Sequence, residues 1–485
     1  MGVSYRGYAT NFSRKGFTFD VSLHSFDGVT PEANSYKCIE ACGVADKVEF
    51  LPHKKLYRYL SGDIDLSVRE KDLTSYKQQL AGLFPEESAN IERLFTEAEK
   101  AYQHISGFLF SRPPFWMRLI ATPFLFYRLL KYENDTVDDF FSRFTSNERL
   151  KTVLSAQWTY YGLPPQQLAF PYFSYPFIDY LKHGGYSIKG GSQKLSDAMR
   201  EVIESHGGHV VLSSPVTKVH IENKQISGVT SKKTGFVKAR RVIANISPQA
   251  VTALTGREHF SPQYLRKLDG TKLSTSAFQI YLGLDCSLQT LGVSSEDYVM
   301  FISNNPDLPA QFQTMRSGQL AGDNSGWSLN FFSNIDPSMA PPGKSTLGIF
   351  TLLGNEGWHG LSKQAYRQKK LALIALMIDK AEAILPGLRG HIEVCEGGTP
   401  ATLTKFTSNP MGAMYGFEQT LPQSGLFRRF PQRYPVKGLY HVGAWTFPGA
   451  GYIGTMLSAR VLIDRYFTSV LPRRRFSFAK KSIAL

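Results

Sequence analysis

One short segment near the carboxyl end constrains the fold more than any other part of the sequence. Residues 438–460 read GLYHVGAWTFPGAGYIGTMLSAR, which predicts a short apolar strand, a glycine-rich turn and a helix with apolar residues three and four positions apart. Glycines at such a junction let backbone N–H groups approach a ligand closely, and the amino end of the helix adds partial positive charge. The segment therefore predicts a site for an anion, or for a ring that becomes anionic when reduced. The competing interpretation is an ordinary strand–turn–helix joint.

Hydrophobic periodicity predicts further elements along the chain. Phe17, Phe19 and Val21 alternate with polar residues, as in a half-buried strand. One helix is predicted after Pro85, and another from Ser192, whose side chain would cap it, to a glycine pair at 207–208. The other expected elements are β-type runs at 209–214, 217–223, 225–231, 242–245 and 439–442, and helices at 368–385 and 453–467.

Composition and charge restrict the partners. The chain has 485 residues, of which 42% are hydrophobic and 20% charged, so it is of ordinary globular composition and long enough for two or three structural units. Its net charge of +15 would suit nucleic acid, an anionic membrane or an acidic substrate. No nucleic-acid motif is present, and we expect no nucleic-acid partner. The basic carboxyl tail, with arginines at 473–475 and lysines at 480–481, suits an anionic membrane surface or a solvated tail equally well.

Targeting signals and metal-ligand spacing are also missing from the sequence. No apolar run follows Met1, and no stretch reaches the ~18 uninterrupted apolar residues of a membrane span. We expect a cytoplasmic protein that lies on a membrane surface without crossing it. Four cysteines are too few for a disulfide scaffold. Cys38 and Cys42 are interpreted as buried thiols, and no metal site is predicted.

The carboxyl segment resembles the flavin motif of the phytoene desaturase, carotenoid isomerase and retinol saturase family of FAD-dependent oxidoreductases. The resemblance implies that the amino end of its helix meets the isoalloxazine ring of FAD. The residues that would line the flavin are Gly443, Ala444, Pro448, Gly449, Ala450, Gly451, Tyr452 and Ile453.

Four further stretches are similar to the same family and follow in the family's order. Residues 6–28 resemble the segment with the family's F-x-F-D strand, and residues 185–199 resemble its P-x-G-G-x-x-x-L helix start. Residues 209–229 contain Pro215 and Val216, which the resemblance places against the adenine through backbone atoms. Residues 399–420 resemble the substrate-side approach to the flavin. Five matches in order imply common descent more strongly than they imply a particular substrate.

The sequence departs from the family at its amino end. Family members begin with a strand, a G-x-G-x-x-G loop, a helix and a second strand ending in Glu, which hold the pyrophosphate and ribose of FAD. Here Gly7, an expected cofactor contact, corresponds to the position after that unit, and Tyr5-Arg6 stands where the family usually has Pro-Gly. We expect roughly 30 residues to be missing, through a miscalled start, a truncation or a second chain that completes the site, and we expect weak FAD binding without them.

Two further features are candidates for function. Residues 108–131 interleave aromatic and aliphatic side chains with arginines, which predicts either a membrane-facing lid over an apolar tunnel or a buried helical hairpin. His24 is the candidate catalytic proton donor, although a lone histidine is more often structural. Tyr415 and Glu418 are weaker candidates.

The resemblance implies an α/β fold of the two-domain FAD/NAD(P)-binding, Rossmann-like type, lacking its first βαβ unit, with a mixed-sheet substrate domain and a helical membrane-facing subdomain. The FAD-binding domain would comprise residues 1–30, 185–250 and 401–470. The helical part would span 31–184, the substrate domain 251–400 and the basic tail 471–485.

The expected function is FAD-dependent desaturation, saturation or cis–trans isomerisation of an apolar, isoprenoid polyene such as a carotenoid or retinoid. One alternative is a flavoenzyme of the amine-oxidase or protoporphyrinogen-oxidase type, which an aromatic cage with a conspicuous acid would favour. The other is a flavin-free remnant that only binds a ligand. The sequence predicts no oligomeric state.

Overall fold

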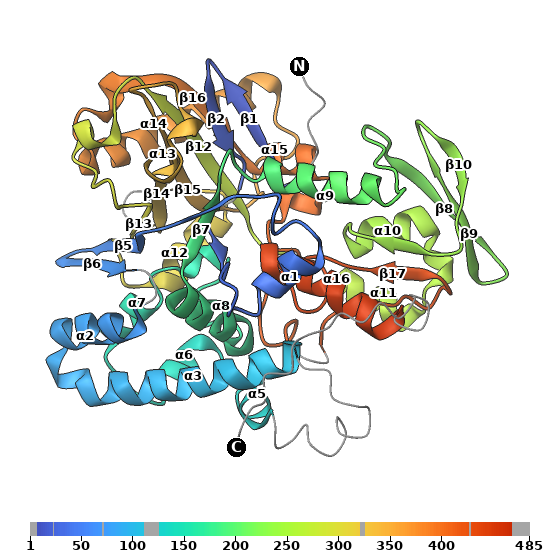
Figure 1. Cartoon of the computed structure of the whole chain (residues 1–485), viewed down its shortest axis with the longest axis horizontal. Helices are drawn as coiled ribbons and strands as arrows, with labels where there is room; N and C mark the ends of the chain where they lie inside the picture. The colour runs from blue at the N-terminus through green and yellow to red at the C-terminus, as the bar shows by residue number, and fades with distance from the viewer. Residues whose placement is uncertain are drawn as a thin grey trace.

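The computed structural model describes residues 7–22, 24–69, 72–110, 126–320, 325–425 and 428–467. A large mixed sheet, a helical layer and a smaller region assembled from distant parts of the chain can be followed in Figure 1. Most of the aromatic–arginine stretch at 108–131 and the basic tail at 471–485 lie outside the described residues.

The large sheet has seven strands in the order β16-β12-β15-β14-β13-β5-β6, and only β13 and β5 run parallel. Every residue of β12 and β15 is buried, so both faces of the central strands are covered. The predicted mixed-sheet part of the fold is thereby confirmed. The strands are β5 (Lys55–Ser61), β6 (Ile64–Arg69), β12 (Ser276–Leu284), β13 (Val299–Ile302), β14 (Trp327–Asn330), β15 (Ser345–Leu353) and β16 (Ile392–Gly398).

The helical layer lies below the sheet in Figure 1, and its longest helix, α3 (Ser88–Phe110), is the helix predicted after Pro85 and buries one apolar face. That face packs against α8 (Phe170–His183), which ends at Gly184 in a positive-φ conformation. None of the helices in the described ranges combines the length and apolar character needed to cross a bilayer. The other helices of this layer are α2 (Leu73–Leu83), α5 (Tyr127–Lys131), α6 (Val137–Ser142) and α7 (Glu148–Leu154).

The third region brings together segments that lie far apart in the sequence. Strand β17 (Leu439–His441) pairs in parallel with β11 (Val242–Ala244) and leads into α16 (Tyr452–Tyr466), close to the predicted bounds. Beside them lie α1 (Tyr36–Ala41) and α9 (Gln193–Ser205), and β8 (Val216–Glu222), β9 (Gln225–Ser231) and β10 (Gly235–Lys238) form a separate sheet. A third small sheet has the order β3-β7-β4, from β3 (Phe26–Asp27), β7 (Gly185–Ile188) and β4 (Phe50–Pro52).

Three local expectations were wrong. Residues 209–214 form a loop instead of a strand, because Ser213 adopts a left-handed φ of 55° that breaks the extended backbone, and β8 begins only at Val216. Cys38 is buried as expected, but Cys42 follows the last residue of α1 and is exposed. The Ser192 side chain does not cap its own helix.

The cap of α9 comes instead from Asp20, at the end of β2 (Phe17–Asp20), which pairs with β1 (Asn11–Arg14). The Asp20 carboxylate accepts hydrogen bonds from the Ser192 amide at 2.5 Å and the Ser192 hydroxyl at 3.0 Å. A Cβ at Gly191 would lie 3.1 Å from the same carboxylate, so the preceding glycine permits the close approach. A buried anion at a helix amino end is stabilised by the helix dipole, and this one joins two segments far apart in sequence.

We expect Asp20→Ala to lower the free energy of unfolding by about 3 kcal/mol, because two charge-assisted bonds are lost and a buried amide is left unpaired. Asp20→Asn, which keeps one acceptor oxygen, should lose less. Urea denaturation monitored by circular dichroism measures both. Asp63→Ala, at an exposed ion pair with Arg149, is the matched control and should leave the midpoint nearly unchanged. An equal loss in all three variants would contradict the role given to Asp20.

Candidate functional site

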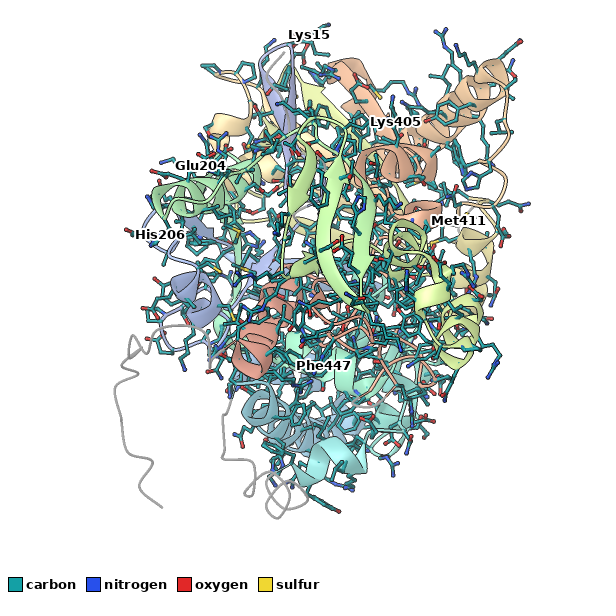
Figure 2. The ribbon with its side chains drawn as sticks, turned by 90° about the vertical axis from the view of Figure 1, so that its right-hand side faces the viewer. Lys15, Glu204, His206, Lys405, Met411 and Phe447 are labelled. Carbon is teal, nitrogen blue, oxygen red and sulfur yellow. The ribbon has the colours of Figure 1, made fainter. Side chains whose placement is uncertain are left out.

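A cavity of about 830 Å³ lies where the three regions meet. This volume is typical of small-molecule and cofactor sites. Its walls come from the segment after β2, the helices α3 and α8, the central strands β12 and β15, and the carboxyl segment at 444–457. Figure 2 shows Phe447 where the carboxyl segment meets the helical layer, and its ring lies 6.1 Å from that of Phe108 on α3. Segments from both ends of the chain therefore enclose one site.

The glycines of the carboxyl segment serve different purposes. Gly451 has φ 88°, and a Cβ there would meet no atom within 4 Å, so its backbone borders open space at the amino end of α16. Gly449 has φ 134°, and a Cβ there would lie 2.6 Å from Arg429 Nη1 and 2.9 Å from the Tyr172 ring. A Cβ at Gly443 would overlap the Asn245 side chain. Only the first of these glycines leaves room for a ligand, whereas the other two are required by packing.

The structure brings most of the sequence-predicted site residues to the cavity, but not all. Pro215 and Val216 do not line it: the Pro215 carbonyl accepts from the Lys232 amide at 3.2 Å, and Val216 pairs with Ser231 at the start of β8. Gly443 and Gly449 are likewise absent from its wall. The predicted residues that line it are Gly7, His24, Ala444, Pro448, Ala450, Gly451, Tyr452 and Ile453.

His24, the predicted proton donor, lines the cavity inside a chain of hydrogen bonds. Its Nδ1 lies 2.8 Å from the Tyr160 hydroxyl, which donates to Asn330 Oδ1 at 2.9 Å. Burial lowers the pKa of His24 to about 4, and a hydrogen bond with Gln279 opposes the shift only in part. The imidazole is therefore neutral near pH 7, and its protonated form is a minor species.

Of the two weaker catalytic candidates, Tyr415 lies at the cavity and Glu418 does not. Tyr415 lines the cavity, and burial raises the pKa of its hydroxyl well above the usual value. Glu418 instead pairs with Arg316 at 2.6 Å and does not reach the cavity wall.

Sequence reasoning missed a pair of acids in the cavity wall. Asp27, at the end of β3, accepts from the Ser25 hydroxyl at 3.3 Å, and Asp179 on α8 accepts from the Tyr102 hydroxyl at 2.8 Å. Burial, followed by the charge of Asp179, raises the pKa of Asp27 to about 8. The backbone that follows Asp27 lies close to the Asp179 carboxylate, because a Cβ at Gly28 would lie 2.5 Å from Asp179 Oδ2. No local signal could have revealed the pair, since its members are far apart in sequence.

A partly buried cation adjoins the carboxyl segment. Arg429 lines the cavity, donates from Nη2 to the Ser424 hydroxyl at 2.9 Å, and lies 5.4 Å from the centre of the Tyr172 ring. Burial lowers the pKa of its guanidinium to about 10, so the group stays charged at neutral pH. The carboxyl segment therefore combines a helix amino end with a fixed positive charge, a setting that favours an anion.

Within the described residues, one group of potential metal ligands lies elsewhere. Asp285, Cys286 and His391 place one ligand atom each within 4.8 Å of one another, and none of them lines the cavity. The Asp285 carboxylate and His391 Nδ1 are 2.8 Å apart, so these two groups already form a partly exposed hydrogen bond with each other.

Known proteins similar in sequence cover nearly the whole chain, although no family model matches it. An all-trans-retinol 13,14-reductase of Danio rerio is 24% identical over 98% of this chain and 82% of its own length. A 4,4'-diapophytoene desaturase of Methylomonas is 26% identical over 93% of this chain and 87% of its own. A chloroplastic prolycopene isomerase of an Oncidium hybrid is 24% identical over 95% of this chain and 78% of its own length.

Solved structures give the same fold. An oxidoreductase of Methanosarcina mazei superimposes with a TM-score of 0.62 over 95% of this chain and 92% of its own, at 15% identity. A putrescine oxidase bound to putrescine superimposes with a TM-score of 0.57 over 94% and 89%, at 11% identity. The predicted two-domain flavoprotein fold and the predicted resemblance are both confirmed. Along nearly its whole length, the chain is therefore similar in sequence to a retinol reductase, a diapophytoene desaturase and a prolycopene isomerase.

Proposed function

We propose that the protein is an FAD-dependent oxidoreductase that desaturates, saturates or isomerises a conjugated isoprenoid. The observation that carries the proposal is the single cavity that the flavin-type carboxyl segment shares with aromatic walls from the sheet and the helical layer. The relatives by sequence, a retinol reductase, a diapophytoene desaturase and a prolycopene isomerase, are named for polyene substrates and support the same substrate class. A bound flavin supplies hydride exchange to such a substrate.

The residues at the carboxyl segment fit the ring of a flavin. The first amides of α16 have no acceptor within the helix, and Gly451 leaves the space beside them open. Ala444, Pro448 and Ala450 line the same part of the cavity and would hold the ring by backbone and small side chains. The guanidinium of Arg429 would stabilise negative charge on the ring.

The remaining walls suit an elongated apolar substrate. Apolar side chains from outside the carboxyl segment also line the cavity. They are Phe350 and Tyr281 of the central strands and Phe108 and Leu129 of the helical layer. Side chains of this kind bind a polyene by shape and exclude water from the reacting carbon atoms. The amine-oxidase alternative shares the fold through the putrescine oxidase, but that likeness is limited to structure at 11% identity.

We expect Gly451→Val to weaken FAD binding at least about tenfold, or about 1.4 kcal/mol, because the new side chain enters the open space at the amino end of α16. Titration of the deflavinated protein with FAD, followed by flavin fluorescence, measures the dissociation constant. Gly343→Val is the matched control, since Gly343 also has positive φ and open surroundings but lies outside the cavity wall.

The two substitutions strain the backbone alike, so an equal loss of FAD binding in both would mean only reduced stability, and unchanged binding in Gly451→Val would place the ring elsewhere. Absence of FAD binding by the unsubstituted protein would favour the ligand-binding remnant over the oxidoreductase.

We also propose that the substrate enters from an anionic membrane surface. The cavity wall includes Leu129 of α5, and the neighbouring Tyr127 and Leu130 are 52% and 40% exposed on the same helix. Apolar side chains exposed at the end of a cavity for an apolar ligand are typical of shallow insertion between lipids. The net charge of +15 adds attraction to anionic headgroups.

The double substitution Tyr127→Ser with Leu130→Ser should reduce binding to anionic liposomes by about tenfold or more, because two apolar side chains no longer enter the lipid. Flotation with phosphatidylglycerol vesicles at low salt measures the bound fraction. Phe236→Ser, on the exposed β10 strand, is the control and should leave binding unchanged. Failure of the unsubstituted protein to float would overturn this proposal.

A further inference from the structure

The acid pair of Asp27 and Asp179 is one of the charged parts of a wall that also carries Glu133, Arg200 and Arg429 and is rich in aromatic rings. The titratable groups around it are Tyr102 on α3, Tyr175, Tyr180 and His183 on α8, Tyr161 before α8, and His53 after β4. Burial raises the pKa of both carboxyl groups, and the charge of Asp179 raises the pKa of Asp27 further.

Burial raises the pKa of Asp179, but hydrogen-bond donors around its carboxyl group oppose that shift. This side chain is 1% exposed, and its carboxylate accepts hydrogen bonds from the Tyr102 hydroxyl at 2.8 Å and the Ser35 hydroxyl at 3.4 Å. His183 Nε2 lies 4.0 Å away on the same helix. A carboxylate with several donors is stabilised in its charged form.

The proton therefore belongs to Asp27, which has far fewer partners. Among the described residues, the hydrogen bond found for its carboxyl group is the one from Ser25 at 3.3 Å, and the side chain keeps accessible surface although it lies deep in the fold. That surface faces the cavity, because Asp27 is one of the lining residues. A neutral carboxyl group in this position has one O–H donor and one acceptor oxygen to offer a ligand.

The strand geometry directs this carboxyl group away from the carboxyl segment. Phe26 precedes Asp27 in β3, and its ring packs 5.6 Å from that of Tyr452 at the start of α16. Successive side chains of a strand point to opposite faces, so Asp27 points toward α8 and Asp179. It is thus placed to bind part of the substrate other than the carbon atoms that react beside α16.

We propose that Asp27, supported by Asp179, is a subsite that binds a hydroxyl or carbonyl end group, so that the substrate is an oxygenated polyene and not a hydrocarbon. The inference rests on the proposed function and adds the polar end group to its substrate class. A hydroxyl group can accept from the neutral carboxyl group and donate to it at once. A hydrocarbon end would displace water and leave the carboxyl group unpaired, and such sites discriminate strongly against the ligand that lacks the polar group.

The test is a set of three ligands that differ only at one end: all-trans-retinol, its analogue with a methyl group in place of the hydroxymethyl group, and its analogue with an aminomethyl group. Quenching of tryptophan fluorescence in the full-length, flavin-loaded protein measures each dissociation constant. Trp445 lines the cavity and reports binding without turnover. We expect retinol to bind about tenfold to a hundredfold more tightly than the hydrocarbon, as the cost of an unpaired buried polar group predicts.

Two variants distinguish recognition from proton transfer. Asp27→Asn keeps a donor and an acceptor and should retain the preference for retinol. Asp27→Val should lose that preference and bind the hydrocarbon at least as tightly as it binds retinol. Thr407→Val, at another polar position of the cavity wall, is the control and should keep the preference of the unsubstituted protein.

Equal affinities for retinol and the hydrocarbon in the unsubstituted protein would overturn the inference, as would the same loss of preference in Asp27→Asn and Asp27→Val. Tighter binding of the amine than of the alcohol would also overturn it and would assign the acid pair to a cation, as the amine-oxidase alternative requires. If none of the three retinoids binds, retinoids are excluded from the proposed substrate class, and the end-group inference fails with them. The two failures therefore give different results.

The pH dependence of stability tests the protonation of Asp27 separately. Its pKa in the folded protein is about 8, above the usual 3.8, so the folded state keeps a proton that the unfolded state releases between these values. Stability is consequently lost as the pH rises through that window. The melting temperature of Asp27→Asn relative to the unsubstituted protein should rise from pH 5 to pH 9, and a constant difference would contradict a protonated Asp27.

Discussion

The architecture depends on one buried ionic interaction, in which the carboxylate of Asp20 is bound by the amino end of α9. The strand that carries Asp20 also packs its Phe17 and Phe19 rings into a cluster with Tyr281 of the large sheet, and the Tyr281 hydroxyl donates to the Val21 carbonyl at 2.8 Å. One side of this strand thus packs on the large sheet, and its end binds the helix α9 of the third region. The cavity is lined by residues of both, so Asp20 connects two of its walls.

Periodicity was sufficient for the elements whose burial is one-sided. The helix predicted after Pro85 is α3, and the strand β17 and the helix α16 were predicted within one residue of their observed bounds. The loop at 209–214 shows the limit of the method: its residues suit a strand, but Ser213 adopts a left-handed conformation that no propensity indicates. Likewise, Ser192 has the side chain of a cap, and only tertiary contact shows that Asp20 takes that role.

The candidate site was predictable where it is continuous in sequence and not where it is assembled by folding. The carboxyl segment was located from glycine spacing and family resemblance, yet its glycines proved to differ: Gly449 makes room for Arg429, whereas Gly451 faces the cavity. Asp27 and Asp179 come from a two-residue strand and a helix that meet only in the folded chain. A neutral carboxyl group also has no signature of its own, because an aspartate in a sequence gives no sign of its pKa.

The strand β3 is only two residues long, yet its two side chains serve the two ends of the cavity. Phe26 touches Tyr452 on the cofactor side, and Asp27 meets Asp179 on the other. A shift of one residue would move the other, because both belong to the two-residue strand that pairs with β7. Any coupling that this strand transmits between ligands at the two ends would change both affinities by the same factor, because thermodynamic linkage is reciprocal.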